Sequence, residues 1–254
     1  YISLAILSLL FAFQRKGTAW IGSVFGPVIL LWFITIGLLG AASISINPKV
    51  LAAINPLHAA SVFLDNRFTG FAVLGTVFLA VTGGEVLYAD MGHFGKSPIR
   101  TAWFAIVLPA LLLNYFGQGA FLLDNPELSE NLFYRIVPEM LHYPLVVLAT
   151  LATIIASQAV ISGAFSLTRQ AIHLGFCPRL RIIHTSSMEI GQVYIPAVNF
   201  FLFLGTAILI IAFKSSGNLA GAYGVAVSGT MLATTVLALI AARRSEERRV
   251  GKEC

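Results

Sequence analysis

Apolar runs of about 20 residues recur along this chain, and they constrain its fold more than any other feature. A helix of about 20 apolar residues is long enough to cross the hydrocarbon core of a bilayer. Of the 254 residues, 57% are hydrophobic and 11% are charged, whereas soluble proteins average about 25% charged residues. The sequence therefore predicts an all-α fold, a polytopic bundle of helices in a lipid bilayer.

We expect one partial membrane span and six complete ones. The partial span covers 1–13, where the chain starts inside an apolar run without a charged leader, so we expect a fragment of a longer protein. The complete spans are expected at 18–42, 68–92, 99–123, 144–173, 193–213 and 218–242. A polar connection with two Asn-Pro pairs, 46–68, follows the first of them.

The C-terminal stretch differs from the membrane domain because it is highly charged. We expect residues 1–242 to form a partial membrane domain and 243–254, RRSEERRVGKEC, to be a separate tail. Two interpretations of the tail stay open: a basic face beside the membrane, or read-through from a sequencing adapter. We assign it no function.

Basic residues in the connections predict the orientation of the spans. Alternate connections on one side hold Arg15, Lys16, Lys96, Arg100, Arg169, Arg179 and Arg181, and those on the other hold Lys49, Arg67, Arg135 and Lys214. Lys and Arg mark the cytoplasmic side of a membrane protein. We therefore expect the loop with Arg179 and Arg181 to be cytoplasmic, and the acidic loop with Glu127 and Glu130 to be external. This bias accounts for the positive charge without a nucleic-acid partner.

The stretch LAVTGGEVLYADMGHFGKSPIR, at 79–100, places two glycines and a carboxylate inside an apolar span. Ionisable groups within membrane spans usually face a bundle interior and mark ion paths or proton relays. Helical spacing would bring Thr82, Glu85 and Tyr88 to one side. If Gly83 and Gly84 instead unwind the helix, freed carbonyls lie beside the carboxylate, as in the cation sites of transporters. The stretch predicts a bend and a cation site, although glycines that allow close packing, with Glu85 as a structural hydrogen-bond partner, remain the alternative.

Other polar groups within the spans are weaker candidates. Asp90 follows near the expected cytoplasmic end of the same span. Ser157, Gln158 and Ser162 could line a path or serve as contacts between helices, and these interpretations are equally weighted. Tyr223 is a phenol among small residues and could point into a cavity.

The sequence offers little for an enzyme. The histidines lie in or beside connections and form no HExxH pattern, and Cys177 and Cys254 have no metal-ligand spacing. No nucleophile elbow and no phosphate-binding glycine loop with a lysine occur. We therefore expect no catalytic residue, no cofactor and no metal other than a transported ion.

Three long motifs resemble the KUP/HAK/KT family of potassium uptake permeases. They are TGGEVLYADMGHFGKSPIRTAWFAIVLPALLLNYFGQGA, IIASQAVISGAFSLTRQAIHLGFCPRLRIIHTSSMEIGQVYIPAVN and SSGNLAGAYGVAVSGTM, within a similarity that covers 1–242. The family in turn resembles LeuT-like transporters of the amino-acid/polyamine/organocation superfamily, which contain two inverted five-helix repeats. The resemblance implies the end of family helix 4, helix 5 and the second repeat, helices 6–10.

The resemblance implies secondary-active potassium uptake across the cytoplasmic (inner) membrane, generally coupled to protons. By motif, Glu85 matches the sixth-helix glutamate, Thr82 the hydroxyl before the break and Tyr223 the tenth-helix tyrosine. Carbonyl and hydroxyl oxygens suit a potassium ion, and desolvation favours the protonated form of a carboxyl, so Glu85 could carry the proton.

Several partners and alternatives stay open. The N-terminal and C-terminal parts of the same transporter are expected to complete the ion site, and a homodimer is not excluded. A potassium channel-like pore and a membrane scaffold without transport are the alternative functions.

Overall fold

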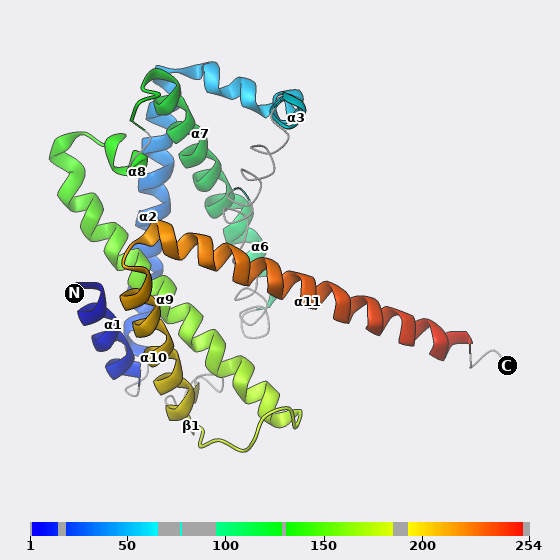
Figure 1. Cartoon of the computed structure of the whole chain (residues 1–254). Helices are drawn as coiled ribbons and strands as arrows, with labels where there is room; N and C mark the ends of the chain where they lie inside the picture. Colours follow the sequence, from blue (N-terminus) through cyan, green and yellow to red (C-terminus); the bar gives the residue numbers. More distant parts are fainter. Residues whose placement is uncertain are drawn as a thin grey trace. The chain divides into compact units, whose positions relative to one another are not determined.

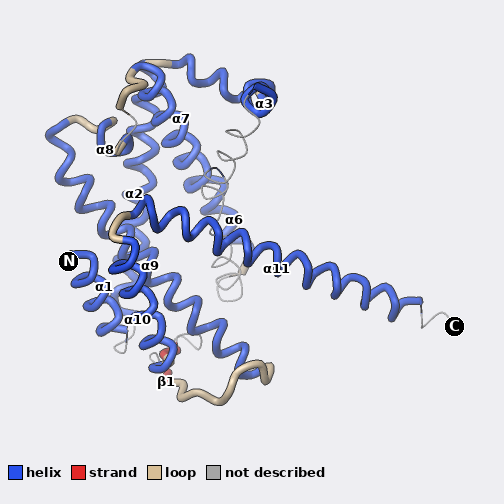
Figure 2. Tube along the Cα trace, viewed as in Figure 1, coloured by secondary structure: helices blue, strands red, loops and turns tan. Residues whose placement is uncertain are grey.

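In the computed structural model, residues 2–14, 19–65, 77, 95–128, 131–184 and 193–250 are described. This part of the chain is almost entirely helical (Figures 1 and 2). It divides into two compact units, one within 1–61 and 84–204 and the other within 62–83 and 205–254.

The elements follow one another along the chain with short connections. In order they are α1 (Ile2–Phe13), α2 (Ala19–Ile46), η2 (Pro48–Ile54), α3 (Pro56–Asp65), α6 (Lys96–Ala102), η3 (Trp103–Val107), α7 (Leu108–Asp124), α8 (Leu132–Arg135), η4 (Glu139–Leu141), α9 (His142–His173), β1 (Ile183–His184), β2 (Val193–Tyr194), α10 (Pro196–Phe213) and α11 (Ser216–Val250).

Five helices in the described ranges are long and apolar enough to cross a membrane. They cover Val24–Ile46, Lys96–Asp124, Glu139–His173, Pro196–Phe213 and Ser216–Arg243. Their large apolar side chains are often exposed, for example Leu31 at 54%, Phe201 at 69% and Leu237 at 66%. Such surfaces are what lipid or further membrane helices would cover. The expected span at 68–92 lies outside the described residues.

The structure adds detail to two of the expected boundaries. The part of the Asn-Pro connection that is described, 46–65, contains two short helices, and each Asn-Pro pair starts one of them. The side chain of Asn47 accepts a hydrogen bond from the Lys49 backbone N–H, and that of Asn55 accepts one from Leu57. Asparagine is a favoured N-cap and proline a favoured first helical residue, so η2 and α3 begin at these pairs.

The span expected from residue 193 begins at Pro196 instead. Val193 and Tyr194 form β2, which pairs antiparallel with β1, Ile183 with Tyr194 and His184 with Val193. The apolar run continues without a break into the helix, so hydrophobicity alone could not separate strand from helix. A proline at the first helical position sets the boundary.

The helices α2 and α7 lie side by side (Figure 1) and pack through small residues. A Cβ built on Gly40 would meet the carbonyl oxygen of Leu113 and lie 2.7 Å from the backbone nitrogen of Asn114. One built on Gly117 would meet the Cα of Gly40. Ser43, which is 7% exposed, donates a hydrogen bond of 2.8 Å from Oγ to the Gly117 carbonyl. Small residues of this kind allow membrane helices to approach closely.

A π-helical turn, η3, interrupts the helix that runs from Lys96 to Asp124. The Leu108 N–H donates to the Trp103 carbonyl, five residues back. Pro109 follows at once, and a proline ring clashes with the carbonyl four residues before it in a regular α-helix. The wider turn accommodates that ring.

A cluster of buried apolar side chains joins α1, α9 and the β2–α10 segment. Its members are Leu10, Phe11, Ile161, Phe165, Val193 and Ile195. Aromatic contacts extend it: Phe165 meets Tyr194 and Phe11 meets Phe203, both with ring centroids 5.7 Å apart and edge-on. This core positions the polar groups described next.

Candidate functional site

The strongest sequence candidates, Thr82 and Glu85, lie outside the described residues, as do Tyr88 and Asp90. Their expected roles, and the expected bend at 82–84, therefore stay predictions. The other four candidates are described: Ser157, Gln158 and Ser162 on α9, and Tyr223 on α11.

The three α9 candidates make different contacts. Ser157 donates a hydrogen bond of 2.8 Å from Oγ to the Thr153 carbonyl of its own helix. Ser162 is exposed within the described structure. Gln158 differs from both, because its Oε1 accepts a hydrogen bond of 2.8 Å from the Nε2 of Gln14. Gln158 thus joins two helices that are far apart in the sequence.

Gln14 and Asn199 together cap the C-terminal end of α1. A helix leaves its last four carbonyls without intrahelical partners. Gln14, only 5% exposed, donates from Nε2 to the Leu10 carbonyl at 3.2 Å as well as to Gln158. Asn199 on α10 donates from Nδ2 to the Phe11 carbonyl at 3.3 Å. One side-chain amide from the residue after α1 and one from α10 therefore satisfy two of these carbonyls.

The Asn199 Oδ1 is the one buried side-chain oxygen or nitrogen without a hydrogen-bond partner in the described part of the chain. An unpaired buried acceptor costs free energy, and a bound water is the usual remedy. The cluster of Gln14, Gln158 and Asn199 is therefore a polar site inside an apolar core. Its groups are neutral amides and carbonyls, which can hold helices in register or hold water.

Sequence reasoning missed Gln14 and Asn199. Gln14 directly precedes two basic residues, which made it look like part of a loop. Asn199 is a lone amide in the apolar run PAVNFFLFLG, and a lone amide in a membrane helix is a signal for contact between helices. That signal could have identified Asn199, whereas nothing local could have identified its partner.

Tyr223 lies on α11 in the second unit and is 48% exposed. Its neighbour Gly221 has open space around it within the described structure. The phenol ring of Tyr223 is therefore partly exposed on the surface of α11 within the described structure.

The described residues hold no group of three or more His, Cys, Asp or Glu side chains that could bind a metal. Cys177 is a free, partly buried thiol. The chemistry that the described site offers is hydrogen bonding by neutral oxygens and amides.

Long apolar helices joined by buried amide contacts and small-residue packing define the chain as an integral membrane protein of the polytopic helical class. The chain belongs to the family described as the K+ potassium transporter integral membrane domain, whose model matches residues 1–251. Members of this family are potassium transporters and not enzymes, which confirms the resemblance drawn from the three motifs.

Curated relatives are similar over nearly the whole chain. A low affinity potassium transport system protein Kup from Pectobacterium carotovorum subsp. carotovorum (strain PC1) is 58% identical over 93% of this chain and 38% of its own length. A probable potassium transport system protein Kup 3 from Dechloromonas aromatica (strain RCB) is 60% identical over 96% of this chain and 39% of its own length. A low affinity potassium transport system protein Kup from Yersinia pestis (strain Pestoides F) is 59% identical over 92% of this chain and 38% of its own length.

The chain thus spans less than two fifths of the length of these curated relatives. No solved structure matches it significantly.

Proposed function

We propose that the complete protein containing this chain takes up potassium across the cytoplasmic membrane as a secondary-active transporter. The observation that carries the proposal is the 58–60% identity to potassium transport proteins over more than nine tenths of the chain. The long apolar helices are consistent with this function, because an ion path across a bilayer needs a bundle of spans around it.

We further infer that uptake is coupled to protons and that Glu85 carries the proton. Glu85 is the one charged side chain expected well inside a span. Its carboxylate can alternate between charged and neutral states. Thr82 and Tyr223 would supply neutral oxygens to the potassium ion, which binds well to carbonyl and hydroxyl groups. The resemblance of the motifs supports these roles.

In this proposal the chain supplies one inverted repeat of a LeuT-like fold, and other parts of the same transporter complete the ion site. Transporters of this kind place ions near the bilayer midplane, where the two repeats meet and helices are broken. The chain by itself is then expected not to transport.

Rubidium uptake by the complete protein in potassium-starved cells tests the proposal. We expect saturable uptake that an uncoupler abolishes, because the proton gradient drives it. Saturable uptake that moves no protons into the cell, measured as the change in external pH, would exclude proton coupling while leaving potassium transport intact. Flux that rises without saturation would indicate a channel-like pore, and absence of flux at normal surface expression would indicate a scaffold.

A further inference from the structure

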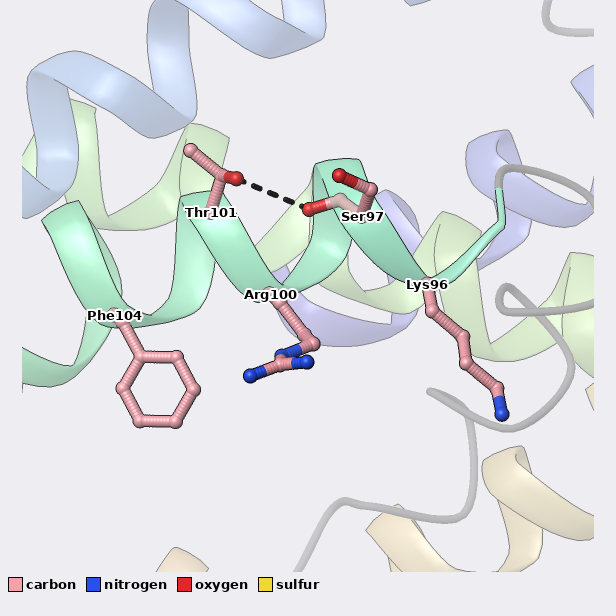
Figure 3. A pocket seen from close by; sticks show the side chains of 5 residues that line it. All are labelled: Lys96, Ser97, Arg100, Thr101 and Phe104. Carbon is pink, nitrogen blue, oxygen red and sulfur yellow. Dashed lines mark hydrogen bonds between the residues drawn. The ribbon is translucent and has the colours of Figure 1, made fainter.

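A pocket of about 420 Å³ lies at the start of the helix that runs from Lys96 to Asp124. The described residues that line it are Lys96, Ser97, Arg100, Thr101 and Phe104. Figure 3 shows that Lys96, Arg100 and Phe104 extend from one side of the helix, whereas Ser97 and Thr101 lie on another. One side of the helix therefore presents two cations followed by an aromatic ring.

The two cations lie close together on the helix. Lys96 and Arg100 are four residues apart on a helix, where like charges repel each other. No ion pair links either of them to a carboxylate among the described residues. A bound anion would relieve the repulsion, and a phosphate group pairs well with both guanidinium and ammonium groups.

The hydroxyl groups of the pocket differ in availability. Thr101 donates from Oγ1 to the Ser97 carbonyl at 3.1 Å (Figure 3), so its proton is already used. The Ser97 hydroxyl makes no hydrogen bond to another described residue. It lies on a different side of the helix from the two cations and also lines the pocket.

Along the helix axis the pocket changes from basic at Lys96 and Arg100 to apolar at Phe104. A lipid molecule has the matching order, a polar headgroup followed by acyl chains. At 1.5 Å per residue, Arg100 lies about 6 Å from Lys96 along the axis and Phe104 about 6 Å further on. The headgroup region on each side of a bilayer is about 5–7 Å thick. Cations in that region therefore place Phe104, which is 60% exposed, at the edge of the hydrocarbon.

A neighbouring aromatic residue supports the position of Phe104 at the edge of the hydrocarbon. Trp103, which is 41% exposed, directly precedes Phe104, and tryptophan is enriched at the interface between membrane and water. A free phosphate ion would make no use of the apolar end of the pocket, whereas a lipid would use both ends.

We propose that this pocket binds an anionic phospholipid, with the phosphate of the headgroup on Lys96 and Arg100 and an acyl chain along Phe104. Anionic lipids give the cytoplasmic leaflet its negative surface potential and attract basic segments beside membrane helices. The basic bias of this connection predicts that it faces the same leaflet.

Native mass spectrometry of the complete protein in detergent tests the proposal. Phosphatidylglycerol and phosphatidylcholine with the same acyl chains are added separately, and the bound fractions are compared. We expect the unmodified protein to prefer phosphatidylglycerol. The preference should fall about tenfold or more in the double variant Lys96→Gln/Arg100→Gln, because each basic residue contributes to attraction of an anionic surface.

Two control variants show whether a loss of lipid preference comes from this site, from the lower net charge of the protein or from misfolding. Lys49→Gln/Lys214→Gln removes the same charge elsewhere and should keep the preference. Lys96→Arg/Arg100→Lys keeps both cations in place and should also keep it. An equal loss in the distant double variant would overturn the proposal, as would equal binding of both lipids to the unmodified protein.

A competition arm distinguishes the lipid from a free anion. Inorganic phosphate at millimolar concentration should not displace phosphatidylglycerol, and Phe104→Ala should weaken lipid binding. Displacement by phosphate together with an unaffected Phe104→Ala variant would show a simple anion site and would overturn the lipid assignment.

Discussion

Gln14, directly after α1, donates a hydrogen bond of 2.8 Å to Gln158 on α9, across 144 positions of sequence. The donor is 5% exposed and lies beside the apolar cluster around Phe11 and Phe165. In an apolar medium, an amide that loses its partner has no water to replace it. This pair is therefore expected to fix how α1 rests on α9.

Breaking this pair should reveal a measurable coupling between the two glutamines. We expect Gln14→Leu and Gln158→Leu, combined in a double-mutant cycle, to show a coupling energy of about 0.6 kcal/mol, the average for hydrogen bonds between membrane helices, and at most about 1.7 kcal/mol. Reversible unfolding of the complete protein in mixed micelles measures it.

Ser157→Ala provides the matched control for that cycle. Its hydroxyl bonds to its own helix at Thr153, so its coupling with Gln14 should be close to zero. A coupling between Ser157 and Gln14 as large as that between the two glutamines would contradict the assignment.

The close approach of α2 and α7 predicts a strong position dependence for glycine substitutions. Gly40→Ala should destabilise the protein by about 1–3 kcal/mol, because the new methyl group meets the backbone of Leu113 and the helices must separate. Gly26→Ala on the same helix is the control, since its Cβ would enter open space. There alanine should be neutral or slightly stabilising, given its higher helix propensity.

Thermal stability of the purified complete protein compares the two alanine variants. If Gly26→Ala lowers stability as much as Gly40→Ala does, the tight packing of α2 on α7 is not what holds this region together.

The unbroken helix α9 predicts that its two flanking loops lie on opposite sides of the membrane. It contains 32 residues, which corresponds to about 48 Å and exceeds the hydrocarbon thickness. The basic bias further predicts that Cys177, beyond its C-terminal end, is cytoplasmic and that Glu127, before its N-terminal end, is external.

Thiol labelling of the complete protein in cells tests this orientation, with all cysteines removed except the one under study. Cys177 should react with an impermeant reagent only after permeabilisation, and Glu127→Cys should react in intact cells. The reverse pattern would invert the topology, and labelling of both positions in intact cells would contradict a membrane-spanning α9.

The proposed proton carrier predicts a different phenotype from the proposed potassium ligands. In the complete protein, Glu85→Gln should abolish proton-coupled uptake and its pH dependence, since glutamine cannot alternate between charged and neutral forms. Rubidium uptake measured over a pH series, at matched surface expression, reports both. Normal pH-dependent uptake by this variant would show that the proton is carried elsewhere.

Thr82→Ala and Tyr223→Phe should chiefly weaken potassium affinity. Each removes one neutral oxygen, and a contact of this strength is worth about 0.5–1.5 kcal/mol. The apparent Km for rubidium should therefore rise several-fold, up to about tenfold, while the maximal rate is largely kept. Unchanged Km values in both variants would remove these two residues from the proposed site.

The sequence by itself determined the class of fold, the approximate positions of the spans that lie in the described residues, and the family. These features depend on local composition and on contiguous motifs: an apolar run long enough to cross a bilayer predicts a helix such as α9 wherever it occurs. Even the boundary that was misplaced, at Pro196, has a local explanation once β2 is seen. The family motifs likewise lie in unbroken stretches, so the order of residues along the chain is enough to carry the resemblance.

Only the tertiary structure decided which residues meet. The pairing of Gln14 with Gln158, the capping of α1 by Asn199, and the contact of Gly40 with Gly117 each join positions far apart in the chain. Glutamine and glycine at such positions are compatible with many roles, and periodicity does not specify a partner. The specific contacts arise because membrane helices select one another by close packing and by satisfying buried polar groups, and both depend on the three-dimensional arrangement.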